Sequence, residues 1–120
     1  MDAVPAGLLV ACLCAAWCRS CDGYRATFEA AARGRPGARF VWIDIEDASD
    51  ALAPFDLDVE NFPTLAVARG GELRFLGALT PQPQTLARML DAAERAPLRA
   101  GAVAEPARFV ATLASIGQAV

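Results

Sequence analysis

Two cysteines separated by two residues, Cys18 and Cys21, carry the strongest chemical signal in this sequence of 120 residues. They lie in the segment Trp17-Cys18-Arg19-Ser20-Cys21, directly before a helix-like stretch. Residues three apart on a helical turn share a face, so the two thiols can interconvert between a dithiol and a disulfide. A helix N-terminus also favours negative charge, which helps the first cysteine to ionise. The spacing therefore predicts a redox site.

Two further cysteines, Cys12 and Cys14, lie on the apolar run before this segment. Because Cys12 and Cys14 are two residues apart on one predicted strand, their side chains share a face. The simplest interpretation is a pair of small buried hydrophobic residues. A second redox pair is an alternative, although neighbours at i and i+2 are poorly placed for a disulfide with each other. A zinc or iron–sulfur site built from all four thiolates is another.

The composition predicts one folded domain over residues 1–120. Hydrophobic residues make up 55% of the chain, and its mean hydropathy is +0.32. The net charge is −3, with no long run of like charge, so neither nucleic acid nor an anionic membrane is an expected partner. The chain contains 0 histidines, so acid–base chemistry must use thiols, carboxylates or water. The leading interpretation requires no cofactor and no metal.

The apolar run 6–16 has some features of a signal peptide. However, Asp2 stands where a signal carries basic residues, and cleavage would remove the strand that positions the dithiol. No run reaches the roughly 18 apolar residues of a membrane span. We therefore expect a cytoplasmic protein.

Apolar periodicity and turn residues predict alternating strands and helices. The predicted strands span 8–14, 39–45, 64–68 and 73–76, and the predicted helices span 18–33, 49–55, 84–95 and 106–117. The paired glycines Gly70 and Gly71 join the last two strands as an antiparallel hairpin. The order is a βαβ unit followed by a hairpin and a helix, which indicates an α/β fold.

Four segments in this order resemble the thioredoxin-like superfamily over residues 7–96. They are Ala16-Trp17-Cys18-Arg19-Ser20-Cys21, Ile43-Asp44-Ile45-Glu46-Asp47, Phe62-Pro63-Thr64-Leu65, and Gly70-Gly71-Glu72 leading to Leu76-Gly77-Ala78-Leu79. The resemblance implies a roughly four-stranded mixed sheet flanked by helices, with residues 97–120 as a C-terminal helical extension.

The resemblance also implies a substrate groove beside the dithiol. Pro63 would be a cis-proline whose neighbouring backbone pairs with an extended substrate, although Pro63 taken alone is an ordinary proline at the start of a strand. Gly77 and Ala78 would line the groove, and Arg19 beside Cys18 would also belong to it. Trp17 and Phe62 would form its apolar rim, unless either is simply a core side chain.

In the implied mechanism, Cys18 attacks a substrate disulfide and Cys21 resolves the mixed disulfide. The commonest thioredoxins have Gly-Pro where this chain has Arg19-Ser20. The charge of Arg19 favours the thiolate, so we expect a couple less reducing than thioredoxin.

The chain departs from the family in two other ways. Cys12 stands where thioredoxins usually carry a buried aspartate, so resolution is slow or relies on water or on the acids near Asp44. Full thioredoxins also have a strand and helix ahead of the dithiol strand, and the seven residues before Leu8 cannot supply them. Strand 39–45 is then near a sheet edge. We expect helix 106–117 to pack over the exposed face, with dimerisation through the edge as the competing solution.

The predicted function is thiol–disulfide exchange with protein or small-thiol disulfides. Electrons would come from a donor such as a reductase, and the chain would be a monomer or a weak dimer. The alternative is a redox-sensing or protein-binding module that keeps the fold with little turnover.

Overall fold

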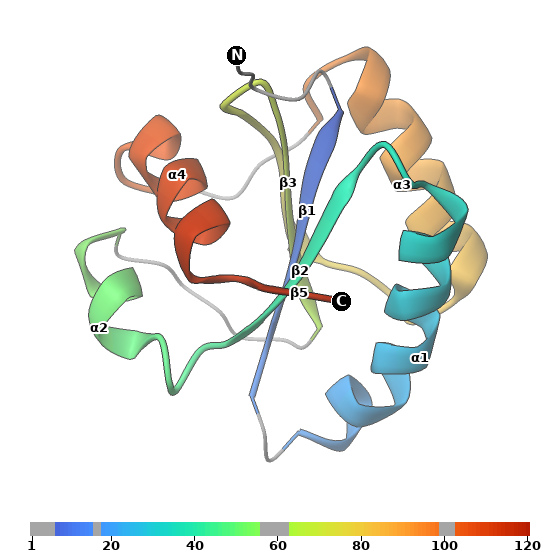
Figure 1. Cartoon of the computed structure of the whole chain (residues 1–120), viewed down its shortest axis with the longest axis horizontal. Helices are drawn as coiled ribbons and strands as arrows, with labels where there is room; N and C mark the ends of the chain where they lie inside the picture. The colour runs from blue at the N-terminus through green and yellow to red at the C-terminus, as the bar shows by residue number, and fades with distance from the viewer. Residues whose placement is uncertain (1–6, 16–17, 56–62, 99–102) are drawn as a thin grey trace.

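The computed structural model describes residues 7–15, 18–55, 63–98 and 103–120, which form one sheet with helices on both faces (Figure 1). Its strands are β1 (Leu8–Cys14), β2 (Arg39–Asp44), β3 (Thr64–Arg69), β4 (Glu72–Ala78) and β5 (Gln118–Ala119). Its helices are α1 (Arg19–Gly34), α2 (Ser49–Leu52) with the 3-10 turn η1 (Ala53–Phe55), α3 (Pro83–Arg95) and α4 (Pro106–Ile116). Within these ranges, no helix is both long and apolar enough to cross a bilayer.

The strand order is β4-β3-β1-β2-β5, which places β1 at the centre of the sheet. β1 runs parallel to β2 and antiparallel to β3. β3 and β4 form the predicted antiparallel hairpin. At its turn, Gly70 and Gly71 have φ of 59° and 86°, in the left-handed region that glycine adopts without a steric cost.

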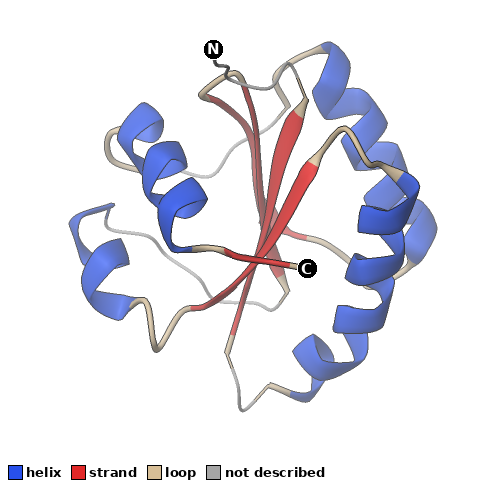
Figure 2. Cartoon of the chain, in the orientation of Figure 1, coloured by secondary structure: helices blue, strands red, loops and turns tan. Residues whose placement is uncertain are grey.

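Each face of the sheet is covered by two helices, α1 and α3 on one side and α2 and α4 on the other (Figure 2). Successive side chains of β1 point to opposite faces of the sheet, so β1 contributes residues to the core on each face. Val10, Cys12 and Cys14 belong to the core cluster that includes Tyr24 and Phe28 of α1. Ala11 and Leu13 belong to the second cluster, with Phe109 and Leu113 of α4. The side chains of β1 are therefore packed into a separate core on each face of the sheet.

The sheet is mixed, as the resemblance implied, and β5 adds a fifth strand along β2 to the roughly four expected. Val41 pairs with Ala119 and Trp42 with Gln118 in antiparallel register. A two-residue strand carries too little periodicity to be found in a sequence. Gly117 makes this strand possible, because a Cβ at that position would collide with the side chain of Val41.

The prediction that helix 106–117 covers an open sheet face was confirmed. Phe109 and Leu113 are buried beneath α4, and the ring of Phe109 meets that of Phe55 edge-on at 5.3 Å between centroids. The helix and β5 together cover β2 from one face and one edge. The C-terminal segment is thus part of the packed core.

We expect Phe109→Ala to lower the free energy of unfolding by about 3–5 kcal/mol, since it leaves a cavity in the second core cluster. Ser115→Ala, on the exposed face of the same helix, is the matched control and should change little. Urea titration of both variants measures the difference. Equal midpoints for the two variants would show that α4 does not support the sheet.

Candidate dithiol site

Cys18 lies at the N-cap of α1, just beyond the end of β1. Its amide donates to the carbonyl of Ala15 at 3.0 Å, which ties the start of the helix to the residue after β1. Its own carbonyl accepts from the amides of Cys21 at 3.2 Å and Asp22 at 3.3 Å. Cys18 is partly exposed, and Arg19 beside it is exposed. The first cysteine of the motif is therefore open to a reaction partner at a helix N-terminus.

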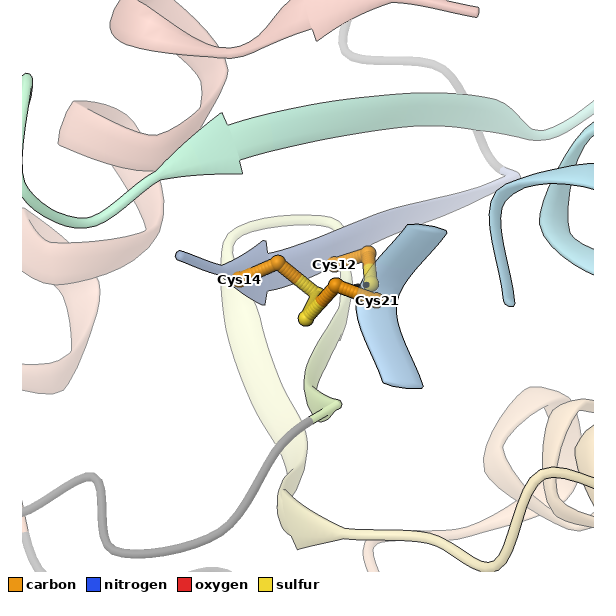
Figure 3. Close-up of a disulfide and its surroundings, with 3 residues drawn as sticks. All are labelled: Cys12, Cys14 and Cys21. Carbon is orange, nitrogen blue, oxygen red and sulfur yellow. Dashed lines mark hydrogen bonds between the residues drawn. A yellow bond between two sulfur atoms is a disulfide. The ribbon is translucent and has the colours of Figure 1, made fainter. Parts of the chain in front are cut away.

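Cys21 lies one turn into α1, with an exposed fraction of only 2%. Its sulfur forms a disulfide with Cys14, at a Cα–Cα distance of 5.9 Å (Figure 3). Cys18 is free. The structure thus pairs Cys21 with the last residue of β1, whereas the sequence analysis paired it with Cys18 and favoured a purely apolar role for Cys14. The physical reason is that Cys14 projects onto the face of the sheet that α1 covers.

Cys12 is a free, fully buried thiol on the same face of β1. Its sulfur is 3.6 Å from that of Cys14, as expected for residues two apart on a strand. Burial raises the pKa of Cys12 to about 12. Cys12 therefore stays protonated near neutral pH and does not replace the missing aspartate as a base.

Aromatic side chains of α1 and β2 surround these sulfurs. The ring of Phe28 meets that of Trp42 edge-on at 5.7 Å, and the guanidinium of Arg25 lies 4.9 Å from the centre of the Trp42 ring. The hydroxyl of Tyr24 is buried without a hydrogen-bond partner in the described structure. Burial, and to a smaller extent Cys12, raises the pKa of Tyr24. The environment of the disulfide is thus apolar and disfavours charge.

Asp44, the residue suggested as an acid near the dithiol, is the register partner of Cys14 on β2. One of its carboxylate oxygens accepts hydrogen bonds from the amides of Glu46 at 2.9 Å and Asp47 at 3.3 Å. Asp44 therefore closes the turn after β2 while lying at the same end of the sheet as the disulfide.

Three of the predicted groove residues lie together at this end of the sheet. Pro63 is buried, and its carbonyl accepts a hydrogen bond from Leu79 at 3.4 Å. Gly77 and Ala78 pair with the first two residues of β3. β3 in turn pairs Thr64 with Leu13, so Pro63 lies level with the end of β1 that carries Cys14.

Arg19, also predicted for the groove, is exposed at the start of α1, and the two remaining groove predictions fall outside the described residues. Trp17 lies in segment 16–17, and Phe62 lies in segment 56–62. The peptide bond before Pro63 joins it to Phe62 and so also involves an undescribed residue. The cis-proline and the apolar rim thus stay predictions.

The residues that the structure describes include no group of three or more His, Cys, Asp or Glu side chains suited to a metal ion. Two of the four thiols proposed as alternative metal ligands, those of Cys14 and Cys21, are joined to each other. The arrangement seen here is that of a disulfide site.

The fold resembles that of solved thioredoxins. The germline thioredoxin Deadhead of Drosophila melanogaster is 21% identical with a TM-score of 0.63, over 74% of this chain and 83% of that one. Fasciola hepatica thioredoxin is 22% identical with a TM-score of 0.64, over 73% and 82%. Mitochondrial thioredoxin 3 of Saccharomyces cerevisiae is 21% identical with a TM-score of 0.62, over 74% and 82%. No protein-family model matches the sequence. No curated protein matches it either.

The chain therefore has a thioredoxin-like α/β fold, as the sequence motifs predicted. The fold carries a cysteine pair capable of forming a disulfide where the central strand passes into the first helix. At these identities the likeness establishes the fold alone.

The spacing of the cysteines did not predict the part that Cys14 plays in the disulfide. The available signal was the pattern of faces. Val10, Cys12 and Cys14 alternate along one face of a strand, and Cys21, Tyr24 and Phe28 form the apolar stripe of the helix that follows. Such a strand and helix pack together. Cys14, the last core-facing residue of the strand, then meets Cys21, the first core-facing residue of the helix.

We expect stability to fall at alkaline pH because of Cys12. The pKa of this thiol rises from 9.0 to about 12 on folding, so the unfolded chain loses its proton first as the pH increases. Stability from this group is present below pH 9 and is lost toward pH 12. Between pH 8 and 10 the loss is about 1.4 kcal/mol. Tyr24 adds a smaller loss in the same direction.

The comparison that isolates Cys12 is between Cys18→Ser and the double variant Cys18→Ser with Cys12→Ala. The Cys18→Ser background prevents the exposed thiol from exchanging with the disulfide. Urea titrations at pH 8 and pH 10 should show that removing Cys12 reduces the loss of stability by about 1.4 kcal/mol. Parallel pH profiles for the two proteins would contradict the assignment.

Proposed function

We propose that this protein is a thiol–disulfide oxidoreductase in which Cys18 is the nucleophile and Cys21 the resolving cysteine. One observation carries the proposal. A partly exposed free thiol, Cys18, lies at the N-terminus of α1, one turn from a sulfur that already takes part in a disulfide. Exposure suits the residue that meets the substrate, and burial suits the residue that resolves the intermediate.

The reaction begins from the reduced protein. The Cys18 thiolate attacks one sulfur of a substrate disulfide, and the other substrate sulfur leaves as a thiolate that takes up a proton. Cys21 then loses its proton and attacks the sulfur of Cys18. A Cys18–Cys21 disulfide forms, and the remaining substrate sulfur leaves as a thiol. Two electrons pass from the protein to the substrate, which ends as a dithiol.

The surroundings of the two cysteines support this assignment of roles. The N-terminus of α1 favours a negative sulfur at Cys18, and the exposed Arg19 adds a positive charge next to it. We propose on the same ground that the couple is less reducing than that of thioredoxin. Pro63, Gly77 and Ala78 lie at the same end of the sheet, and we propose that they receive the extended chain of a protein disulfide, with Trp17 and Phe62 at its rim.

We propose protein or small-thiol disulfides as substrates and a reductase as electron donor, in the cytoplasm, with the chain as a monomer or weak dimer. Likeness to thioredoxins at the level of the fold supports disulfide substrates and a reductase in general terms. The alternative is a redox-sensing module with little turnover. The absence of a buried carboxylate at Cys12 favours slow resolution and keeps that alternative open to test.

Reduction of the insulin disulfides by dithiothreitol, followed as turbidity, tests the proposal. We expect catalysis by the unaltered protein, and a loss on the order of 100-fold or more in Cys18→Ser, because the nucleophile is removed. Reduced Cys21→Ser mixed with insulin without dithiothreitol should stall as a covalent adduct between Cys18 and its substrate, visible on a non-reducing gel.

Cys12→Ala serves as the matched control, because it removes another cysteine of the same cluster and should keep the rate of the unaltered protein. If the unaltered protein were no faster than Cys18→Ser, the chain would not catalyse disulfide reduction. A single stoichiometric reaction without turnover would instead support the sensing module.

A further inference from the structure

Cys14, the disulfide partner of Cys21, is buried, whereas Cys18 is partly exposed. Cys14 is the last residue of β1, with an exposed fraction of 1%. Cys18 is the partly exposed N-cap residue of α1. Cys21 is one helical turn from Cys18 and is bonded to Cys14. One sulfur is therefore within reach of two partners, one buried and one accessible.

We propose that Cys14 is a third redox cysteine, which takes over Cys21 after Cys18 has reacted and so stores the disulfide beneath the surface. The proposal rests on the function proposed above, because it begins from the Cys18–Cys21 disulfide that the reaction produces. It adds a residue outside the Cys18-Cys21 motif, on the preceding strand.

The transfer is an internal exchange with no net oxidation. The thiol of Cys14 loses its proton and attacks the sulfur of Cys21. The Cys14–Cys21 bond forms, the Cys18–Cys21 bond breaks, and Cys18 leaves as a thiolate that takes up a proton. The products are the buried disulfide and the free Cys18 that the structure contains.

The packing of the site favours this direction. The Cys14–Cys21 disulfide is a neutral group inside the apolar cluster of Val10, Tyr24 and Phe28, where a thiolate is disfavoured. The leaving sulfur, Cys18, is at the helix N-terminus and partly exposed, where negative charge is favoured. The transfer is therefore favourable for both cysteines: Cys14 becomes part of a neutral disulfide in the core, and Cys18 becomes a free thiol at the helix N-terminus.

The consequence is a protein that stays reactive after it has been oxidised. Cys18 is free to attack a second disulfide, but Cys21 is no longer available to resolve the product. The second reaction therefore ends in a stable mixed disulfide at Cys18. Reduced protein turns over as a dithiol enzyme, and oxidised protein captures a thiol partner through one cysteine.

Glutathione disulfide supplies the test. Reduced protein is mixed with one equivalent, samples are quenched with acid at intervals, free thiols are alkylated, and disulfides are mapped by peptide mass spectrometry. We expect Cys18–Cys21 to appear first and to be replaced by Cys14–Cys21, with Cys18 becoming free again. An excess of glutathione disulfide should then leave one glutathione on Cys18.

The matched variant is Cys14→Ala, which keeps the Cys18-Cys21 motif. Once oxidised, it should retain the Cys18–Cys21 disulfide, and alkylation of Cys18 should be at least about 10-fold slower than in the oxidised unaltered protein. If Cys14→Ala does not fold, the disulfide mapping of the unaltered protein still tests the proposal.

The outcomes separate this inference from the proposed function. If Cys18–Cys21 forms and persists while Cys14 stays alkylatable, Cys14 takes no part and only the inference fails. If Cys14–Cys21 forms equally fast in Cys18→Ser, the buried pair oxidises by itself and the transfer is again excluded. If Cys18 does not react with glutathione disulfide at all, the proposed function fails and the inference fails with it.

Discussion

The contact between the end of β1 and the first turn of α1 is the interaction on which the rest of the site depends. β1 is the central strand, with its two faces buried in two different cores. A strand held in this way has little freedom to move, so its last inward residue has a fixed position. The amide of Cys18 donates a hydrogen bond to the carbonyl of Ala15, which fixes the start of α1 relative to that residue. Two sulfurs from different elements can then be held at bonding distance, and a third left at the surface.

The cysteines differ in exposure, and this difference organises their chemistry. Thiol exchange requires a thiolate, and a thiolate is stable only where water or favourable dipoles surround it. Cys18 is partly exposed at the N-terminus of α1, whereas burial in the interior of this cluster raises the pKa of the Cys12 thiol. A buried sulfur in such a place is better accommodated as half of a disulfide than as a thiolate. In the proposed reaction, position in the core thus decides which sulfurs attack and which hold the bond.

The sequence was sufficient for the fold because the fold follows from regular patterns. The apolar run at 8–14, the helical stripe of Tyr24 and Phe28 and the hairpin glycines each produce the expected element. β5 was out of reach because its two residues are placed by Gly117 and by the neighbouring backbone of β2, with no pattern of their own. The site divides in the same way. The motif identified Cys18 and Cys21, but the disulfide of Cys14 depends on how a strand and a helix pack, which spacing along the chain does not encode.

The C-terminal segment links stability of the sheet to the geometry of the site. α4 buries Phe109 and Leu113 against the face of the sheet opposite α1, and β5 pairs with β2. β2 is the parallel neighbour of β1, and the amide of Ile45 donates to the carbonyl of Cys14 at 2.9 Å. The strand that carries Cys14 is thus supported by β2, and β2 is supported by the chain's last elements. A sulfur at the end of β1 can exchange partners reproducibly only if its backbone stays in place while the bond moves. The packing of α4 and β5 therefore supports the backbone on which the proposed exchange depends, although neither element carries a cysteine.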